Sequence, residues 1–372
     1  MNSKIAITKC PSYESALVQD SVRRAIDLLG GISNFIKPGS RVLVKPNLLM
    51  GVAPEAGVCT HPEVIRAVIR ILKEINCKIS LGDSPSVWGI HIENVDNVYE
   101  LSGVKKICLE EGVDLIKLEK RRWHGKFILT TAIDNCDYIV SIPKFKTHGL
   151  TTLTGAVKNL FGLVSGTYKT EVHKKYFIVD DFAGILVDIY EKVKPALTII
   201  DAITAMEGDG PGTSGSLRQL NLILASSDGV ALDAAMARIM GVNPLDVLTN
   251  KIAYKRGLGE LDFNKIEVKG EKLEDVIGKP FLLPTSSMAT KLPKPVINLI
   301  KLLIKLRPYV LYEKCIRCEA CVKACPSKII RLNNNWIAFD YSGCIACFCC
   351  QEVCPKAAIK VKKSLLARII GL

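Results

Sequence analysis

The sequence predicts an α/β fold for residues 1–285, a mainly parallel sheet with flanking helices, followed by a small cysteine-rich α+β domain at the C-terminus. Two observations support the first part: short apolar runs alternate with segments of helical periodicity, and polar residues follow the apolar runs. The second part stands out because nine of the fourteen cysteines lie between Cys315 and Cys354. The chain therefore divides into a large and a small domain of different chemistry.

The elements of the large domain follow from their side chains in chain order. Runs rich in valine, isoleucine and leucine, which favour strands, occupy Ile5–Thr8, Arg41–Val44, Lys78–Leu81, Tyr138–Ile142, Ala196–Ile200 and Leu222–Ala225. Apolar residues recur at helical spacing in Val18–Leu29, Pro62–Ile75, Asp180–Val193 and Gly229–Met240. The proline that opens the second of these segments suits a first helical turn. Strands that alternate with helices of this length indicate βαβ units.

Composition and charge narrow the class of protein. Apolar residues make up 48% of the 372-residue chain, enough for a packed core, and no apolar run reaches the roughly 18 residues that a spanning helix needs. The N-terminus lacks a signal-peptide pattern, so we expect a cytoplasmic protein whose cysteines bind metal. The formal net charge of +13 suits an acidic partner protein, an anionic substrate, a membrane surface or nucleic acid. Nucleic acid is not expected as a partner, because aromatic residues are only 6% of the chain and do not alternate with basic ones.

The cysteine-rich segment is an internal repeat with an offset of 29 residues. Its first copy has the pattern Y-x-x-C-x-x-C-x-x-C-x-x-x-C-P from Tyr312 to Pro326, and the second copy repeats it from Tyr341 to Pro355. Three closely spaced thiolates can wrap one face of a [4Fe–4S] cube. The segment, residues 312–361, resembles the bacterial-type ferredoxin domain with two [4Fe–4S] clusters. A zinc site is the alternative, but zinc usually takes two short pairs of ligands and fits the doubled set poorly.

The ferredoxin resemblance implies two clusters as cofactors, and it implies their ligands. In such domains the cysteine before proline ligates the cluster of the other copy. Cluster 1 then takes Cys315, Cys318, Cys321 and Cys354, and cluster 2 takes Cys344, Cys347, Cys350 and Cys325. A ninth cysteine, Cys349, aligns with Ala320 of the first copy and is expected to fill space beside a cluster. A spare ligand or an oxidation-sensitive thiol is the alternative for Cys349.

Polar side chains follow four successive strands of the large domain. Open α/β sheets bind ligands at the carboxyl ends of their strands, so these side chains predict a binding site and are expected to converge on one cleft. Lysines that follow a strand and precede a glycine-marked helix start suit a carboxylate or phosphate group. The candidate substrate-binding residues are Lys45, Asn47, Asp83, Ser84, Lys144, Lys146, Lys158, Asn159 and Asp201.

Three features of the large domain each allow two interpretations. His148 is the candidate catalytic residue, because it is the titratable group best placed for proton transfer at neutral pH, and a structural histidine is the alternative. The glycine-rich stretch from Glu207 to Gly215 could cover a ligand as a lid or form a plain surface turn. A divalent-metal site is conceivable, although no spacing requires it, at Asp83, Asp201, Asp228 and Asp233.

A basic, apolar linker at residues 286–311 joins the two domains, and a similar tail closes the chain at 362–372. Packing on the protein or on a second subunit is the expected role of both, which leaves a homo-oligomer open. Contact with a membrane surface is the less favoured alternative. We therefore divide the chain into an α/β domain at 1–285, the linker, the two-cluster domain at 312–361 and the tail.

The large domain also resembles a known family. The runs that carry the resemblance read VLVKPN, GDSP, PKFKTH, TGAVKNLFG and DAI, and they begin at Val42, Gly82, Pro143, Thr154 and Asp201. They are similar to the family called domain of unknown function 362. Its members often end in a two-cluster ferredoxin and are typical of anaerobic bacteria and archaea. The resemblance implies this architecture but no reaction.

The leading hypothesis is a redox enzyme, an iron–sulfur oxidoreductase that passes low-potential electrons through two clusters to an anionic substrate or cofactor held by the α/β domain. The main alternative is a non-catalytic electron-transfer module that docks between larger redox proteins. An enzyme whose clusters are structural or sense redox state is the third. From Tyr312 onward the chain has ten Lys/Arg and four Asp/Glu, so the electron donor or acceptor protein is expected to be acidic.

Overall fold

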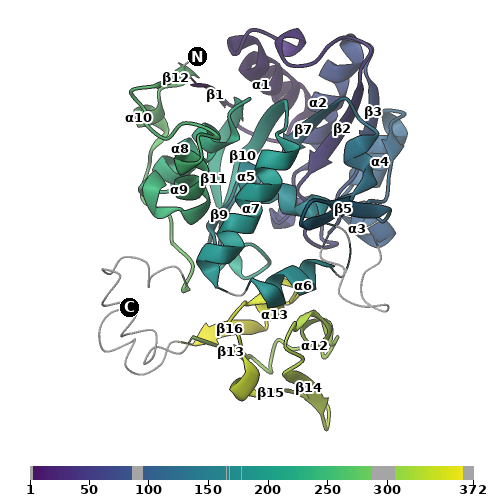
Figure 1. The fold of residues 1–372 in the computed structure, drawn as a ribbon, viewed down its shortest axis with the longest axis vertical. Helices are drawn as coiled ribbons and strands as arrows, with labels where there is room; N and C mark the ends of the chain where they lie inside the picture. The colour runs from purple at the N-terminus through teal and green to yellow at the C-terminus, as the bar shows by residue number, and fades with distance from the viewer. Residues whose placement is uncertain are drawn as a thin grey trace.

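The structure, a computed structural model, describes residues 3–85, 95–164, 166, 168–176, 178–286 and 306–362. Figure 1 shows a large α/β part and a small part that lies against one end of it. Most of the expected linker (287–305) and nearly all of the expected tail (363–372) fall outside the described residues. Within the described ranges, no helix has the length and apolar character needed to cross a membrane.

A mostly parallel sheet, ten-stranded within the described residues, forms the centre of the large part. Its strands are β1 (Ser3–Lys9), β2 (Arg41–Pro46), β3 (Lys78–Leu81), β4 (Asp114–Leu115), β7 (Tyr138–Ile142), β8 (Lys144–His148), β9 (Thr152–Thr154), β10 (Leu197–Gly208), β11 (Gly215–Ser226) and β12 (Ile266–Gly270). The main path runs β12-β1-β11-β10-β7-β2-β3-β4, with β8 paired to β10 and β9 paired to β8. The pairs β1–β11, β10–β11 and β8–β9 are antiparallel, and the other pairs are parallel.

Helices cover both faces of the sheet (Figure 1). The helices α1 (Ser15–Leu28), α2 (Pro62–Glu74) and α4 (Val104–Glu110) pack on the face where Val42 and Val44 are buried. On the other face, α5 (Ala156–Asn159), α7 (Val179–Val193) and α9 (Leu248–Lys255) pack over Leu43, and α8 (Gly229–Ile239) packs over β1, β10 and β11. Because side chains alternate along a strand, β2 is apolar on both sides, as a central parallel strand requires. The remaining elements are α3 (Val95–Leu101), α6 (Tyr168–Lys175), α10 (Leu273–Val276) and the hairpin of β5 (Arg121–His124) and β6 (Phe127–Thr130).

The strands and helices predicted for the large domain are confirmed, with shifts at their ends. Two predicted strands, Lys78–Leu81 and Tyr138–Ile142, have the bounds observed for β3 and β7. The strands β10 and β11 are longer than predicted, at 12 residues each, because they pair as a hairpin. The glycine-rich stretch that could have been a lid or a turn forms the tip of this hairpin.

The small part is built from two strand pairs and two short helices. β13 (Arg307–Val310) pairs antiparallel with β16 (Ile359–Lys362), and β14 (Ile330–Asn333) pairs antiparallel with β15 (Trp336–Phe339). The helices α12 (Ala320–Ala324) and α13 (Cys349–Glu352) start at equivalent positions of the two copies of the repeat. This is the expected α+β arrangement, and β13 adds a strand ahead of the first cysteine.

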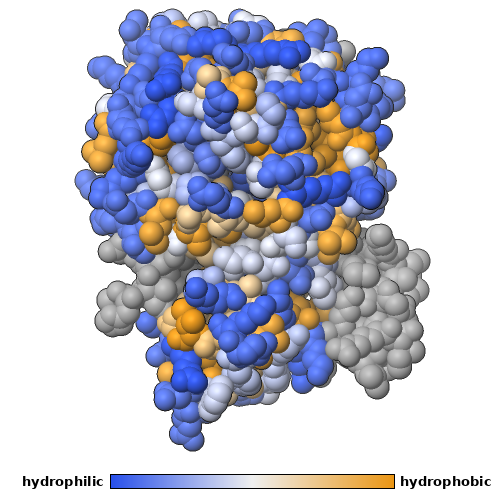
Figure 2. All heavy atoms as spheres, turned by 180° about the vertical axis from the view of Figure 1, so that it is seen from behind, coloured by the Kyte–Doolittle hydropathy of each residue, from blue (hydrophilic) through white to orange (hydrophobic). Residues whose placement is uncertain are grey.

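The second copy of the repeat packs against the large part at the tip of the β10–β11 hairpin. Thr213 Oγ1 donates a hydrogen bond to the Cys354 carbonyl at 2.6 Å. At Gly212, a Cβ atom would come within 2.5 Å of the Glu352 carbonyl oxygen, so the close approach requires glycine. Figure 1 shows α13 at this end of the large part, and Figure 2 shows apolar side chains gathered where the two parts meet.

Candidate functional site

Strand β8 carries three of the predicted site residues. The sequence predicts that Lys144, Lys146 and His148 follow a strand, whereas in the structure they belong to a strand of their own. Residues two apart in a strand point to the same side of the sheet, so the three side chains share one face. Each is at most 1% exposed. The alternation along β8 therefore gathers two lysines and a histidine inside the protein.

Lys144 and Asp201 form a buried ion pair that includes Tyr13. Lys144 Nζ lies 2.8 Å from Asp201 Oδ2 and donates to Tyr13 Oη at 2.7 Å. Tyr13 Oη donates to Asp201 Oδ1 at 2.9 Å, and the His61 backbone N–H donates to Asp201 Oδ2 at 2.9 Å. The rings of Tyr13 and His61 stack with their centroids 3.6 Å apart. The ammonium and carboxylate of this pair are thus engaged within the protein, where they join β8, β10 and the start of α2.

Lys45 and Asp83 form a second buried ion pair, with Lys45 Nζ 2.9 Å from Asp83 Oδ1 and side chains 0% and 2% exposed. The Asp83 carboxylate also accepts hydrogen bonds from two backbone N–H groups, one of them that of Ser84 at 2.8 Å. Asn159 Oδ1 accepts from Asn47 Nδ2 at 3.1 Å and from Lys45 Nζ at 3.4 Å. Five predicted residues from the ends of β2 and β3 and from α5 therefore meet in one hydrogen-bonded group.

His148 faces the small part. Its Nδ1 accepts from the backbone N–H groups of Leu150 at 3.1 Å and Thr151 at 3.4 Å, so the neutral ring carries its proton on Nε2. Nε2 lies 3.2 Å from Glu352 Oε1 at the end of α13. Burial, and then the positive charge of Lys158, lower the pKa of His148 well below its usual value, which keeps the ring neutral at pH 7. The candidate catalytic residue is thus in contact with the cysteine-rich domain.

Three further lysines add positive charge beside His148 and the Lys45–Asp83 pair. Burial lowers the pKa of Lys146 to about 7, and its Nζ donates to a backbone carbonyl at 2.7 Å. Burial also lowers the pKa of Lys169 to about 7, and its Nζ donates to the Ser84 carbonyl. The pKa of Lys158 is lowered by burial as well, and its ammonium has neither an ion pair nor a hydrogen bond within the described residues. A bound anion would be stabilised here and would raise these pKa values.

The predicted site residues therefore gather into two ion-paired groups and a set of lysines that reaches α13. That they line one cleft stays a prediction. Sequence reasoning missed four contributors: Tyr13, His61, Lys169 and Glu352. A signal existed only for Glu352, which takes the place of Lys323 when the two copies of the repeat are aligned. The other three are single residues outside any motif.

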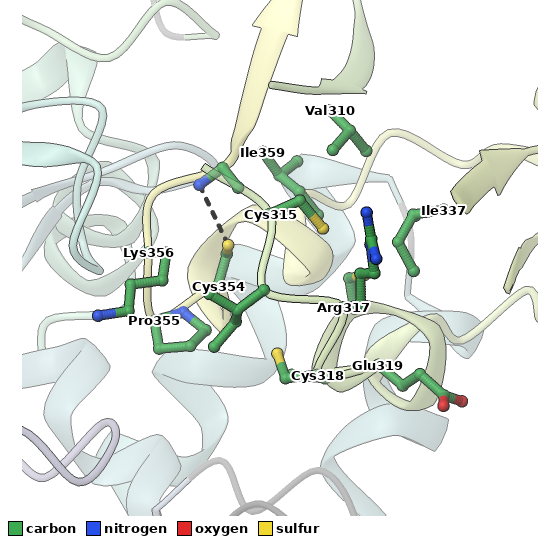
Figure 3. A pocket seen from close by; sticks show the side chains of 14 residues that line it. Val310, Cys315, Arg317, Cys318, Glu319, Ile337, Cys354, Pro355, Lys356 and Ile359 are labelled. Carbon is green, nitrogen blue, oxygen red and sulfur yellow. Dashed lines mark hydrogen bonds between the residues drawn. The ribbon is translucent and has the colours of Figure 1, made fainter. Parts of the chain in front are cut away.

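The two predicted sets of cysteines line two separate hollows of the small part. The first hollow holds about 360 Å³ of space, part of it open to solvent, and its cysteines are Cys315, Cys318, Cys321 and Cys354 (Figure 3). The second holds about 320 Å³, and its cysteines are Cys325, Cys344, Cys347 and Cys350. Apolar side chains complete both linings, and the Ala358 N–H donates to Cys354 Sγ at 3.2 Å. Each hollow collects three closely spaced cysteines of one copy and the cysteine before proline of the other copy, as a two-cluster ferredoxin domain requires, whereas zinc usually takes two short pairs.

Backbone conformation repeats between the two copies as well. Six residues in the cysteine loops have left-handed conformations with φ between 49° and 60°, and they form three pairs at the offset of 29: Arg317 and Ala346, Glu319 and Phe348, Lys328 and Ala357. Such conformations are unfavourable for residues with a side chain, so the surrounding structure must impose them. Left-handed turns point successive backbone N–H groups into a concavity, which suits an anionic iron–sulfur cluster. The residues present therefore fit the expected cofactor.

The acidic residues considered for a divalent metal have other partners. Asp228 accepts from two backbone N–H groups at the start of α8. Asp233 accepts from the N–H groups of Ala156 and Val157 at the start of α5, and burial raises the pKa of Asp233 to about 7. In the part of the chain that the structure describes, no three His, Cys, Asp or Glu side chains are placed to hold one metal ion.

Cys349, the ninth cysteine, is buried and lines neither hollow. A hydrogen bond from Cys349 lowers the pKa of the Cys347 thiol, which does line the second hollow. The charge of Lys158 also interacts with Cys349. Cys349 therefore lies between the second hollow and the lysines of the large part, where a small apolar side chain would also fit.

Comparison with known proteins finds one family in each of the two parts of the chain. Residues 42–238 match the family described as domain of unknown function (DUF362), and residues 307–355 match the 4Fe-4S dicluster domain. The thylakoid-associated protein sll1697 of Synechocystis sp. (strain ATCC 27184 / PCC 6803 / Kazusa) is 32% identical over 265 residues, which are 69% of this chain and 81% of that protein. The dicluster domain supports an iron–sulfur electron-transfer role.

Two solved structures show weak likeness to the chain. The lactate racemase apoprotein from Thermoanaerobacterium thermosaccharolyticum aligns with a TM-score of 0.40 and 12% identity, over 64% of this chain and 57% of that one. A loganic acid methyltransferase aligns with a TM-score of 0.23 and 10% identity, over 84% of this chain and 78% of that one. At these values neither likeness carries an argument about function.

Proposed function

The chain belongs to the family described as domain of unknown function (DUF362), and we propose that it is an oxidoreductase acting on an anionic substrate or cofactor. In this proposal the anion binds beside the lysines of the α/β part. Low-potential electrons reach it through two [4Fe–4S] clusters in the small part. A cytoplasmic location and an electron donor or acceptor protein as partner belong to the same proposal.

The proposal assigns one cluster to each hollow. Cys315, Cys318, Cys321 and Cys354 hold cluster 1, and Cys325, Cys344, Cys347 and Cys350 hold cluster 2. When bound, such clusters supply electrons one at a time. The four thiols and the repeated loop conformation in each copy support this assignment.

One contact carries the proposal: His148 Nε2 lies 3.2 Å from Glu352 Oε1. Glu352 is two residues from Cys350 and two from Cys354, one cysteine from each hollow. The lysine-rich group of the large part and both cysteine sets are therefore neighbours within one chain. Electron transfer between the two parts then needs no large movement of the small part.

The side chains of the large part would bind and position the anion. Lys158 has the ammonium best suited to attract it, because within the described residues that ammonium has no ion pair or hydrogen bond, although Glu352 attracts its charge from further away. Lys146 and Lys169 would gain protons as the anion binds, since burial has lowered their pKa values to about 7. His148 holds a proton on Nε2 at the junction with α13, where it can donate a hydrogen bond or pass a proton.

The test uses full-length protein purified without oxygen, which should contain about eight iron atoms per chain. Dithionite reduces the protein, and a panel of small anions (phosphate esters and di- and tricarboxylates) is added one at a time. We expect at least one anion to raise the melting temperature and to speed reoxidation of the reduced protein. His148→Gln should slow that reoxidation while reduction by dithionite keeps its rate.

The alternative, a non-catalytic module that docks between larger redox proteins, predicts a different result. No anion would then bind, so no anion would shift the melting temperature of either the wild-type protein or Lys158→Met. Such an outcome overturns the enzyme proposal even if the iron content is as expected. Binding of an anion without any reoxidation would instead favour structural or sensing clusters.

A further inference from the structure

The two copies of the cysteine repeat have different surroundings. In the second copy, Glu352 meets His148 of the large part, and Phe348 is buried. The residue that aligns with Glu352 in the first copy is Lys323, which is exposed. The copy that packs on a lysine-rich surface therefore carries an acid at this position, and the copy that faces solvent carries a base.

The first copy also exposes a group of large side chains, which we call the first-copy patch: Tyr312, Ile316, Arg317 and Trp336. The two aromatic residues and Ile316 are 48–56% exposed. The rings of Tyr312 and Trp336 meet edge to face at 4.9 Å, and the Arg317 guanidinium lies 5.0 Å from the Trp336 ring centre. The corresponding residues of the second copy, Tyr341, Ile345 and Ala346, are half-buried. Exposed aromatic residues beside an arginine are typical of the centre of a protein interface.

The first-copy patch adjoins the first hollow. Ile316 and Arg317 line this hollow together with Cys315 and Cys318, and Figure 3 shows Arg317 beside the two cysteines. A protein seated on the patch would therefore lie next to the ligands of cluster 1. The second hollow has its neighbouring helix, α13, against the large part instead.

The charge of the small part indicates the kind of partner. Residues 306–362 contain nine Lys/Arg and four Asp/Glu, and one of the four acids is Glu352, which faces the large part. The surface left for a partner is thus strongly basic. Complementary charge speeds association and selects against basic partners.

We propose that the first-copy patch is the docking surface for an acidic electron-transfer protein, which exchanges electrons with cluster 1. In each exchange the reduced partner loses one electron and cluster 1 gains it, with no proton transferred and no bond formed or broken. The inference rests on the proposed function only in requiring redox-active clusters. It adds the order of transfer: the first copy meets the external protein, and the second copy meets the lysines of the large part.

The test measures binding of an acidic two-[4Fe–4S] ferredoxin to the full-length, cluster-loaded protein by anaerobic isothermal titration calorimetry. The double variant Tyr312→Ala/Trp336→Ala should raise the dissociation constant about tenfold or more, because it removes the aromatic residues that anchor the interface. Arg317→Glu/Lys323→Glu should weaken binding at low salt and lose the salt dependence of wild type. In stopped flow, both variants should be reduced more slowly by the ferredoxin and at the wild-type rate by dithionite.

Two variants of the large part serve as controls. Leu245→Ser removes an exposed apolar side chain of similar exposure, and Lys37→Glu reverses a charge far from the repeat in sequence. Both should bind the ferredoxin like wild type. The proposal is overturned if the patch variants bind and accept electrons as wild type does, or if the control variants weaken binding equally. The experiment uses no anionic substrate. Its result therefore neither supports nor contradicts the proposed reaction, which has a separate test.

Discussion

Two lysines of the site, one buried and one half-buried, should respond differently to the same substitution. Lys144 is 1% exposed and paired with Asp201 at 2.8 Å, so Lys144→Met leaves a buried carboxylate without its cation. Removing one partner of a buried ion pair costs about 3–5 kcal/mol. The Tyr13 hydroxyl and the His61 N–H still donate to Asp201, which places the expected loss of unfolding free energy at the lower end, about 3 kcal/mol.

Lys158→Met should not show this loss. Burial lowers the pKa of Lys158 even though Glu352 attracts its charge, so the folded state already disfavours the ammonium. Removing the Lys158 ammonium also removes the cost of keeping its charge away from water. We therefore expect the free energy of unfolding to stay the same or to rise. The same variant should weaken binding of sulfate, a dianion that does not titrate near neutral pH.

Urea unfolding of the anaerobic, cluster-loaded protein, followed by circular dichroism, measures both effects. The double variant Lys144→Met/Asp201→Leu removes both charges and should recover most of the stability that Lys144→Met loses. Equal losses in Lys144→Met and Lys158→Met would refute the division of these lysines into a structural one and a binding one. The same conclusion would follow if Lys144→Met weakened sulfate binding without lowering stability.

Three further predictions follow from the same contacts. Gly162→Ala should lower the free energy of unfolding by about 1–3 kcal/mol, because its Cβ would clash with the Asp83 carboxylate and the ammonium paired to it; wild-type stability in urea would show that the segment shifts freely. Sulfate affinity should fall about fivefold from pH 7 to pH 8 in calorimetry, because Lys146 has a pKa of about 7 and its protonated fraction drops from one half to about one tenth; a flat profile contradicts this. Cys349→Ala should keep its full iron content, since Cys349 lines neither hollow, whereas Cys318→Ser should lose mainly one cluster's iron; iron loss in Cys349→Ala would make Cys349 a ligand.

Local patterns were enough to predict six strands of the main sheet and the four longest helices described in the large part. β3 and β7 were predicted with their observed bounds, because a short run rich in isoleucine, leucine and valine between polar segments leaves few other structures. The cysteine sets were also predictable, since the ligands of an iron–sulfur cluster are closely spaced in the chain. In both cases the information lies within a few neighbouring residues.

β8 shows where local patterns fail. Its sequence, KFKTH, alternates charged and apolar residues, which is typical of a strand with one face in solvent. In the structure the charged face is buried, because Lys144 pairs with Asp201, 57 residues away. The sequence indicated that polar residues would gather at the strand ends, but it could not show which charges neutralise each other. That choice separates Lys144, which is held by its partners, from Lys158, whose ammonium has no ion pair or hydrogen bond among the described residues.

A charge difference between the copies of the repeat favours one packing of the two parts. Glu352, at the end of α13, meets His148, and the charges of Lys158 and Lys146 both interact with its carboxylate. The first copy has Lys323 at this position, and a lysine there would bring a third ammonium close to those of Lys146 and Lys158. Together with the hydrogen bond from Thr213 to the Cys354 carbonyl, this difference favours packing of the second copy against the lysines, with the first copy turned to solvent.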